Sequence, residues 1–264
     1  MPHAIAKTFD RLKRAGEKGF IPFITAGDPD LETTVRLAPE LARAGADIIE
    51  LGIPFSDPVA DGPTIQRSSE RALRHRYALA DYLQAARSIR NLSETPLVLF
   101  SYFNPILQYG LESLARDARA AGIDGILVTD LTPEEGQSYC DSLERHALDP
   151  IFLVAPTSDA GRIRQIVDRC RGFVYVVSRT GVTGASDSVS DAVRPVVARV
   201  RAATDLPIAV GFGISSAEQV RAVWQIADAA VVGSAIVARI EKHAGSPDLV
   251  ASIAAYCRVL SGRQ

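Results

Sequence analysis

Two carboxylates, Glu50 and Asp61, are the residues in this chain whose types and surroundings best suit catalysis. Glu50 lies inside the apolar run DIIELGI, and Asp61 follows in a loop rich in proline and aspartate. Because side chains alternate along a strand, Glu50 points into the interior of the sheet or barrel if Ile49 and Leu51 pack outward against helices. No basic residue nearby in the sequence could neutralise Glu50, so burial should raise its pKa toward neutral pH. The alternative is a structural glutamate that caps a backbone amide.

The residues that other mechanisms need are missing or misplaced. The chain has four lysines and none lies in a strand-like run, which argues against a Schiff-base aldolase. Its four histidines are scattered near predicted helix ends without a partner at ligand spacing, so no metal site is predicted. No serine or cysteine nucleophile motif stands beside a histidine. Acid and base catalysis by Glu50 and Asp61 is the chemistry that remains.

A repeated unit must position these carboxylates: a short apolar strand, a loop marked by glycine, proline or aspartate, and an amphipathic helix. Eight strand-like runs can be counted, at Phe20–Thr25, Asp47–Leu51, Leu97–Ser101, Gly125–Val128, Ile151–Val154, Phe173–Val177, Ile208–Gly211 and Ala229–Val232. Helical spacing of apolar residues covers Leu31–Ala44 and Asp159–Cys170. An additional helix is expected at Pro63–Arg74, ahead of one at Leu79–Asn91.

Apolar strands that alternate with helices predict a parallel sheet covered on its faces, and eight such units fit a closed barrel. We therefore predict an α/β fold, a single (β/α)8 TIM barrel with additional helices, in which residues 1–264 form one domain. A doubly wound open sheet is the alternative, but no Gly-x-Gly-x-x-Gly motif follows the first strand.

Glycines in the loops after the last two strands predict a phosphate site. Gly211-Phe212-Gly213 follows the seventh strand and Gly233-Ser234 follows the eighth. Glycine lets backbone amides approach an anion, and a helix N-terminus adds donors with a favourable dipole. Each glycine pair alone also fits an ordinary turn, but together they favour phosphate. The polar, glycine-rich loop from Arg179 to Ser186 suits a lid over a ligand, or a merely flexible connection.

Charge and hydropathy indicate which partners and which cell compartment to expect. The net charge is −2, and basic and acidic residues are mixed along the chain. We therefore expect neither a basic surface that binds nucleic acid nor a polybasic membrane anchor. The start of the chain lacks an apolar signal core, and no apolar run approaches the roughly 20 residues of a membrane span. We expect a cytoplasmic protein whose three cysteines are reduced thiols.

Several motifs together resemble the tryptophan synthase alpha chain family. They are ELGIPFSDP from Glu50, ADGP from Ala60, SRTGVTG from Ser178 and GFGI from Gly211, and the likeness runs from Phe20 to Ser234. The resemblance implies a barrel enzyme that splits indole-3-glycerol phosphate into indole and glyceraldehyde 3-phosphate. It implies that Glu50 is the acid/base on the glycerol hydroxyl and indole C3, and that Asp61 receives the indole N–H.

The same resemblance implies the remaining contacts. Phosphate would fall to Gly184, Gly213, Gly233 and Ser234, and the indole would lie among Phe23, Leu51, Tyr102, Tyr175 and Phe212. Arg179 and Thr183 would belong to the lid.

A tryptophan synthase beta chain is the implied partner, in an alpha2beta2 heterotetramer, with pyridoxal phosphate in the beta chain and no cofactor in this one. Asp57, Pro58 and Asn104 would lie in loops that face the partner. Two alternatives stay open: a free-standing lyase with the same site, and a catalytically inactive phosphate-binding subunit that activates a partner.

Overall fold

In the part of the chain that the structure describes, nine parallel strands form a single sheet that curls into a nearly closed barrel. The computed structural model of the chain describes residues 3–177, 189–211 and 213–263. Its strands are β1 Gly19–Thr25, β2 Ile49–Gly52, β3 Leu97–Ser101, β4 Gly125–Val128, β5 Asp149–Ile151, β6 Leu153–Val154, β7 Val174–Val177, β8 Ile208–Gly211 and β9 Ala229–Val232. They are ordered β5-β4-β3-β2-β1-β9-β8-β7-β6. The predicted parallel barrel is confirmed.

The predicted fifth strand, Ile151–Val154, is wrong in one respect because it is two short strands. β5 pairs with β4 and β6 pairs with β7, and a single residue, Phe152, separates them. The chain therefore bends at Phe152, whose carbonyl still accepts a hydrogen bond from the Tyr175 N–H at 3.2 Å. This bend brings the two edges of the sheet together. The second strand begins at Ile49, two residues later than predicted.

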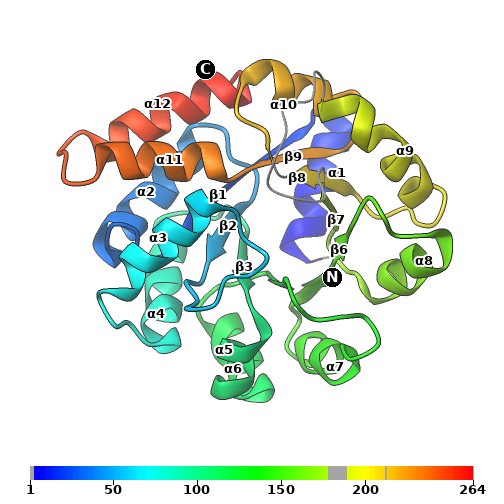
Figure 1. Ribbon diagram of the computed structural model, residues 1–264, viewed down its shortest axis with the longest axis horizontal. Coiled ribbons are helices and arrows are strands. Elements are labelled where there is room, and N and C mark those ends of the chain that lie inside the picture. Colours follow the sequence, from blue (N-terminus) through cyan, green and yellow to red (C-terminus); the bar gives the residue numbers. More distant parts are fainter. Residues whose placement is uncertain (1–2, 178–188, 212, 264) are drawn as a thin grey trace.

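Apart from α1, the helices surround the barrel as an outer ring (Figure 1). In the described ranges the helices are α1 Ala4–Ala15, α2 Leu31–Arg43, α3 Pro63–Leu73, α4 Leu79–Arg90, α5 Phe103–Tyr109, α6 Leu111–Ala120, α7 Gln137–Arg145, α8 Ala160–Arg169, α9 Val189–Arg201, α10 Ala217–Trp224, α11 Ser234–His243 and α12 Leu249–Ser261. The predicted additional helix before α4 is confirmed as α3. No helix in these ranges combines the length and apolar character needed to cross a membrane.

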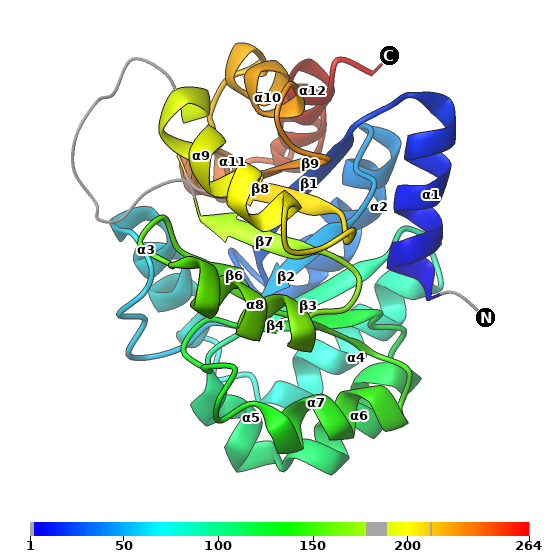
Figure 2. The same ribbon diagram turned by 90° about the vertical axis from the view of Figure 1, so that its right-hand side faces the viewer.

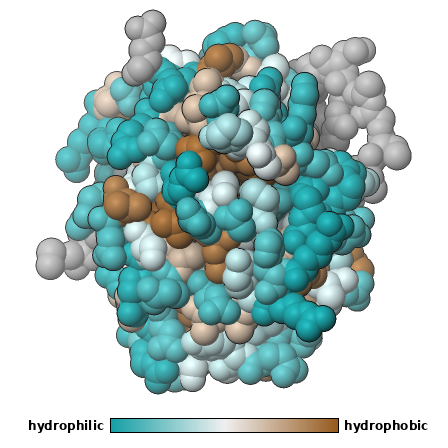
Figure 3. Space-filling view, turned by 90° about the vertical axis from the view of Figure 1, so that its left-hand side faces the viewer, coloured by the Kyte–Doolittle hydropathy of each residue, from teal (hydrophilic) through white to brown (hydrophobic). Residues whose placement is uncertain are grey.

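The core has two layers, as alternation along the strands requires. Ile49 and Leu51 belong to the apolar layer between strands and helices, whereas Phe23 and Val98 belong to the cluster inside the barrel. The outward faces of the helices are polar. Figure 3 shows that the side of the molecule at the left of Figure 1 is largely hydrophilic, with hydrophobic side chains gathered near its middle.

α1 covers the amino-terminal end of the strands. Its buried Phe9 meets Phe173 with ring centroids 5.9 Å apart, so the helix closes that end of the interior. Figure 2 shows α1 on the opposite side of the barrel from α3. The open end that remains is the one at which the carboxyl ends of the strands meet.

Aspartates fix the strands at the closed end. Asp47, Asp124 and Asp228 each stand just before a strand, and each accepts a hydrogen bond from a backbone N–H at or next to the start of the preceding strand in the barrel, at 2.9 to 3.0 Å. Arginines pair with all three carboxylates. These contacts hold strand register far from the open end, which leaves the loops there free to carry chemistry.

Candidate active site

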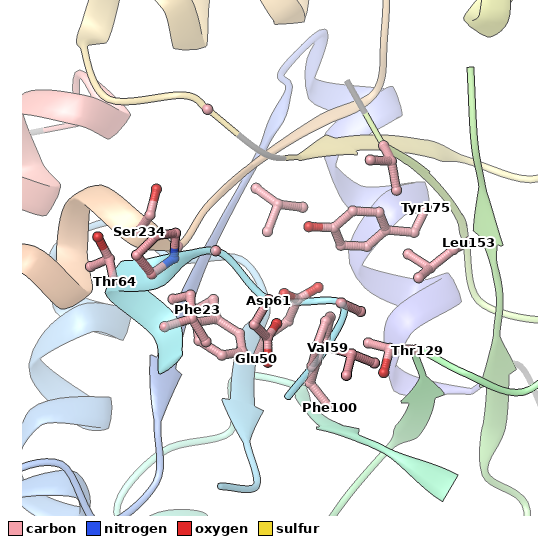
Figure 4. Close-up of a pocket in the computed structure, with 18 residues that line it drawn as sticks. Phe23, Glu50, Val59, Asp61, Thr64, Phe100, Thr129, Leu153, Tyr175 and Ser234 are labelled. Atoms are coloured by element: carbon pink, nitrogen blue, oxygen red, sulfur yellow. The ribbon is translucent and has the colours of Figure 1, made fainter. Parts of the chain in front are cut away.

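A cavity of about 590 Å³ opens at the carboxyl ends of the strands. Its lining comes from both halves of the chain: Phe23, Glu50, Val59, Ala60, Asp61, Gly62, Pro63, Thr64, Ile65, Phe100, Thr129, Leu153, Tyr175, Val177, Gly213, Val231, Gly233 and Ser234. In Figure 4 the two carboxylates lie toward the middle, with Thr64 and Ser234 on one side and Tyr175 and Leu153 on the other. A volume of this size suits a small organic ligand.

β2 places Glu50 inside the barrel, as alternation predicted. Register pairs Glu50 with Phe23 on β1 and with Val98 on β3, both members of the interior apolar cluster. The side chain is fully buried, and neither carboxylate oxygen has a hydrogen-bond partner among the described residues. Burial raises the pKa of Glu50 to about 8. Glu50 accepts no hydrogen bond from a backbone amide of the described residues. The alternative of a structural glutamate that caps such an amide finds no support.

Asp61 reaches the same cavity from the loop that precedes α3. The Tyr102 hydroxyl donates to Asp61 Oδ2 at 3.1 Å and itself accepts from the Ala60 N–H at 3.0 Å. The Gln66 side chain, in the second turn of α3, donates to the Asp61 carbonyl at 2.9 Å. Burial raises the pKa of Asp61 to about 6, against the lowering effect of the Tyr102 hydrogen bond. The carboxyl-terminal end of the loop, at Ala60 and Asp61, is therefore tied to Tyr102 and to α3.

Because their environments differ, the two carboxyl groups have different pKa values and different protonation states near neutral pH. A pKa of about 8 keeps Glu50 largely protonated near pH 7, whereas a pKa of about 6 leaves Asp61 largely ionised. One group can then donate a proton while the other stabilises positive charge. Among the residues that the structure describes, no cluster of His, Cys, Asp and Glu could hold a metal ion.

Three predicted phosphate residues contribute to the wall of the cavity. Gly213, Gly233 and Ser234 all line it, and Ser234 is the first residue of α11. The first N–H groups of a helix have no intrahelical acceptor, and the dipole favours an anion there. Gly213 has a φ of 79°, in the left-handed region that glycine adopts without strain. The N-terminus of α3, at Pro63 and Thr64, lines the same cavity.

The remaining predicted contacts fall into two groups. Gly184, Arg179, Thr183 and Phe212 lie outside the described residues. Among the predicted indole contacts that the structure does describe, Phe23 and Tyr175 line the cavity.

Leu51 and Tyr102, two further predicted indole contacts, are not among the described residues that line this cavity. Leu51 follows Glu50 on β2, so its side chain points away from the cavity into the layer under the helices. Tyr102 is not part of the lining and instead holds Asp61 through its hydroxyl.

Several lining residues could not be found from the sequence because they carry no polar motif. Phe100 meets Phe23 edge to face with centroids 5.3 Å apart, and Leu153 and Val177 add apolar surface. Glycines on the neighbouring strands were the sequence feature that could have indicated inward aromatic rings. A Cβ on Gly52 would lie 2.3 Å from the Phe23 ring, and one on Gly211 would lie 2.1 Å from the Tyr175 hydroxyl. Both glycines therefore make room for an inward aromatic ring on a neighbouring strand.

Comparison with known proteins identifies the family. A sequence model described as tryptophan synthase alpha chain matches residues 9–261. The chain belongs to the tryptophan synthase alpha chain family. The tryptophan synthase alpha chain of Solibacter usitatus is 52% identical over 256 residues, covering 97% of this chain and 96% of that protein. The one from Geobacter sulfurreducens is 54% identical over 238 residues, 90% of each chain.

Solved structures show the same relationship in three dimensions. Tryptophan synthase subunit alpha from Legionella pneumophila superposes with a TM-score of 0.91 at 37% identity, covering 99% of this chain and 98% of that one. A tryptophan synthase chain from Mycobacterium tuberculosis gives the same TM-score, identity and coverage. Members of the tryptophan synthase alpha chain family thus share this barrel along nearly its whole length.

Proposed function

We propose that this chain is a lyase that cleaves indole-3-glycerol phosphate into indole and glyceraldehyde 3-phosphate, a late reaction of tryptophan biosynthesis. The observation that carries the proposal is the carboxyl pair. A fully buried Glu50 and a hydrogen-bonded Asp61 share one cavity that ends at a helix N-terminus. Membership in the tryptophan synthase alpha chain family supplies the substrate.

The protonation states of the two carboxyl groups suggest the order of proton transfers. Protonated Glu50 gives its proton to indole C3, and ionised Asp61 accepts a hydrogen bond from the indole N–H as positive charge develops on the ring. The Glu50 carboxylate then takes the proton of the glycerol hydroxyl next to the breaking bond. The carbon–carbon bond breaks, its electrons return to the indole ring, and the hydroxyl carbon becomes the aldehyde. Glu50 ends protonated, as it began.

The cavity suits the two ends of this substrate. Its phosphate would lie at Gly213, Gly233 and Ser234, where the N-terminus of α11 supplies donors. The indole would lie toward Phe23, Tyr175 and the apolar lining added by Phe100, Leu153 and Val177. Gly184 and Phe212 are proposed to complete the two subsites, and Arg179 and Thr183 a lid, on the strength of the sequence motifs.

A tryptophan synthase beta chain is the proposed partner, with pyridoxal phosphate held by that chain and none by this one. Asp57 and Asn104 are exposed near the open end of the barrel. Two of the exposed large apolar side chains, Val59 and Leu107, lie beside them at 78% and 55% exposure. These exposed apolar side chains would give a partner chain apolar surface to cover. We propose an alpha2beta2 assembly in the cytoplasm.

We also propose that residues 1–264 act as one barrel domain. Both ends of the described chain are tied to the barrel. His3 contacts Asp149 on β5 at 2.5 Å, and Arg263 pairs with Asp47 at 2.9 Å. Ser261 also donates to the Ala44 carbonyl at 2.8 Å.

An assay of indole release, with and without a beta chain, tests the proposed function. We expect slow release by the isolated chain and faster release with the partner, because a partner that favours the competent site raises its population. Equal rates in both conditions would favour the free-standing lyase. No indole in either condition, with beta-chain activity still raised by this chain, would support the inactive activating subunit and overturn the proposal.

A further inference from the structure

Two helices with their N-termini in the cavity are joined farther along by a group of four charged side chains. α3 begins two residues after Asp61, and α11 begins at Ser234 of the phosphate site. In Figure 1 α3 lies next to α11. The joining residues are Arg67 and Arg71 on α3, Glu241 in the last turn of α11, and Asp28 in the loop after β1.

Arg71 is the centre of this group. Its guanidinium donates to both carboxylate oxygens of Asp28, each at 2.8 Å, and to Glu241 Oε1, also at 2.8 Å. The Asp28 side chain is fully buried and that of Arg71 is 18% exposed. Paired charges that are shielded from water, in bidentate geometry, hold their partners more rigidly than exposed ones. Arg71 therefore fixes three segments to one another.

Arg67 adds a second bidentate contact between the same two helices. Its Nε and Nη2 donate to the two oxygens of Glu241 at 2.8 and 2.9 Å. Arg67 and Arg71 are four residues apart, so they share one face of α3 and reach the same carboxylate. A buried hydroxyl contact at 2.7 Å between Ser68 and Thr25 ties the same helix to β1, the strand that carries Phe23.

None of these four residues lines the cavity, so their effect on a ligand must pass through the helices. A rigid connection between α3 and α11 sets how far Asp61 stands from Gly233 and Ser234. The substrate proposed above must reach both places at once, with its ring at Asp61 and its phosphate at α11.

We propose that Asp28, Arg67, Arg71 and Glu241 form a positioning clamp that sets the distance between the Asp61 end and the phosphate end of the site. The proposal rests on the proposed function for the identity of the ligand. A clamp of this kind matters for a molecule that spans both ends. It matters little for a molecule that occupies only one.

Glu241→Ala is the sharpest test, because it removes the link between the helices and leaves Arg71 paired with Asp28, so no buried carboxylate is stranded. We expect kcat/KM for indole-3-glycerol phosphate to fall about 10-fold, since small misplacements of reacting groups cost rate steeply. Inhibition by inorganic phosphate, which needs only one end, should change less than about 2-fold. Arg67→Ala should act in the same direction, and the double variant should lose less than the product of the two single effects.

Glu144→Ala is the matched control. It removes an ion pair of comparable exposure, Arg171 with Glu144 at 2.9 Å, which joins α7 to the segment after α8. Its kcat/KM should stay within about 2-fold of the parent, as expected for a surface pair, and melting temperatures of all variants report any loss of fold. A Glu241→Ala chain with parent kcat/KM, or with phosphate inhibition weakened as much as kcat/KM, would overturn the clamp. A parent chain without lyase activity would instead overturn the proposed function.

Discussion

Replacing Glu50 by Gln should reduce kcat for indole-3-glycerol phosphate cleavage by about 10² to 10⁴. The amide keeps the shape of the side chain on β2 but can neither give a proton to indole C3 nor take one from the glycerol hydroxyl. Steady-state measurement of indole release is the check. A Glu50→Gln chain that keeps half of the parent rate would end the assignment of Glu50 as the acid/base.

Stability separates this loss of chemistry from a loss of fold. Burial raises the pKa of Glu50 from its ordinary value of 4.5 to about 8, so between these values the folded protein binds more protons than the unfolded chain. Folding free energy therefore weakens as pH rises through that window, and the full cost is present above pH 8. Gln does not titrate. The melting temperature of Glu50→Gln should match the parent at low pH, exceed it by a growing margin up to about pH 8, and keep that margin at higher pH.

Replacing Asp61 by Asn should slow cleavage by about 10²-fold with little change in KM, because Asp61 acts on charge that appears in the transition state. The substitution should not disturb the loop, since an amide oxygen at this position can still accept the hydrogen bond from the Tyr102 hydroxyl. Calorimetric or inhibition measurements with a phosphate analogue provide the control for binding. Normal turnover with weakened substrate binding would instead make Asp61 a residue that only positions the substrate.

Much of the site could be predicted because short-range sequence patterns determine which side chains face the cavity. Alternation along β2 was enough to turn Glu50 inward and Leu51 outward, and glycines after β8 and β9 placed Gly213 and Gly233 at the cavity. The family resemblance added residues to the predicted site without regard to the direction in which their side chains point. It put Leu51 in the indole pocket, although the same alternation that turns Glu50 inward turns Leu51 toward the helices.

Features made by distant segments were not visible in the sequence. The bend at Phe152 depends on which neighbours β5 and β6 pair with, and no local pattern sets that choice. The resemblance placed Tyr102 among the indole contacts, and no local pattern shows that its hydroxyl donates to a carboxylate 41 residues away in the chain. The ion pairs of Arg71 join helices and a loop far apart in sequence, and each residue alone looks like an ordinary surface charge.

The central claim is that one carboxyl group acts protonated while its neighbour acts ionised, and the pH dependence of kcat/KM tests it most directly. This parameter reports the essential groups of the free enzyme. We predict a bell with an acid limb near pH 6 from Asp61 and an alkaline limb near pH 8 from Glu50. In Asp61→Asn the residual rate should lose the acid limb and keep the alkaline one. A rate that continues to rise above pH 8, or an acid limb unchanged in Asp61→Asn, would contradict this account.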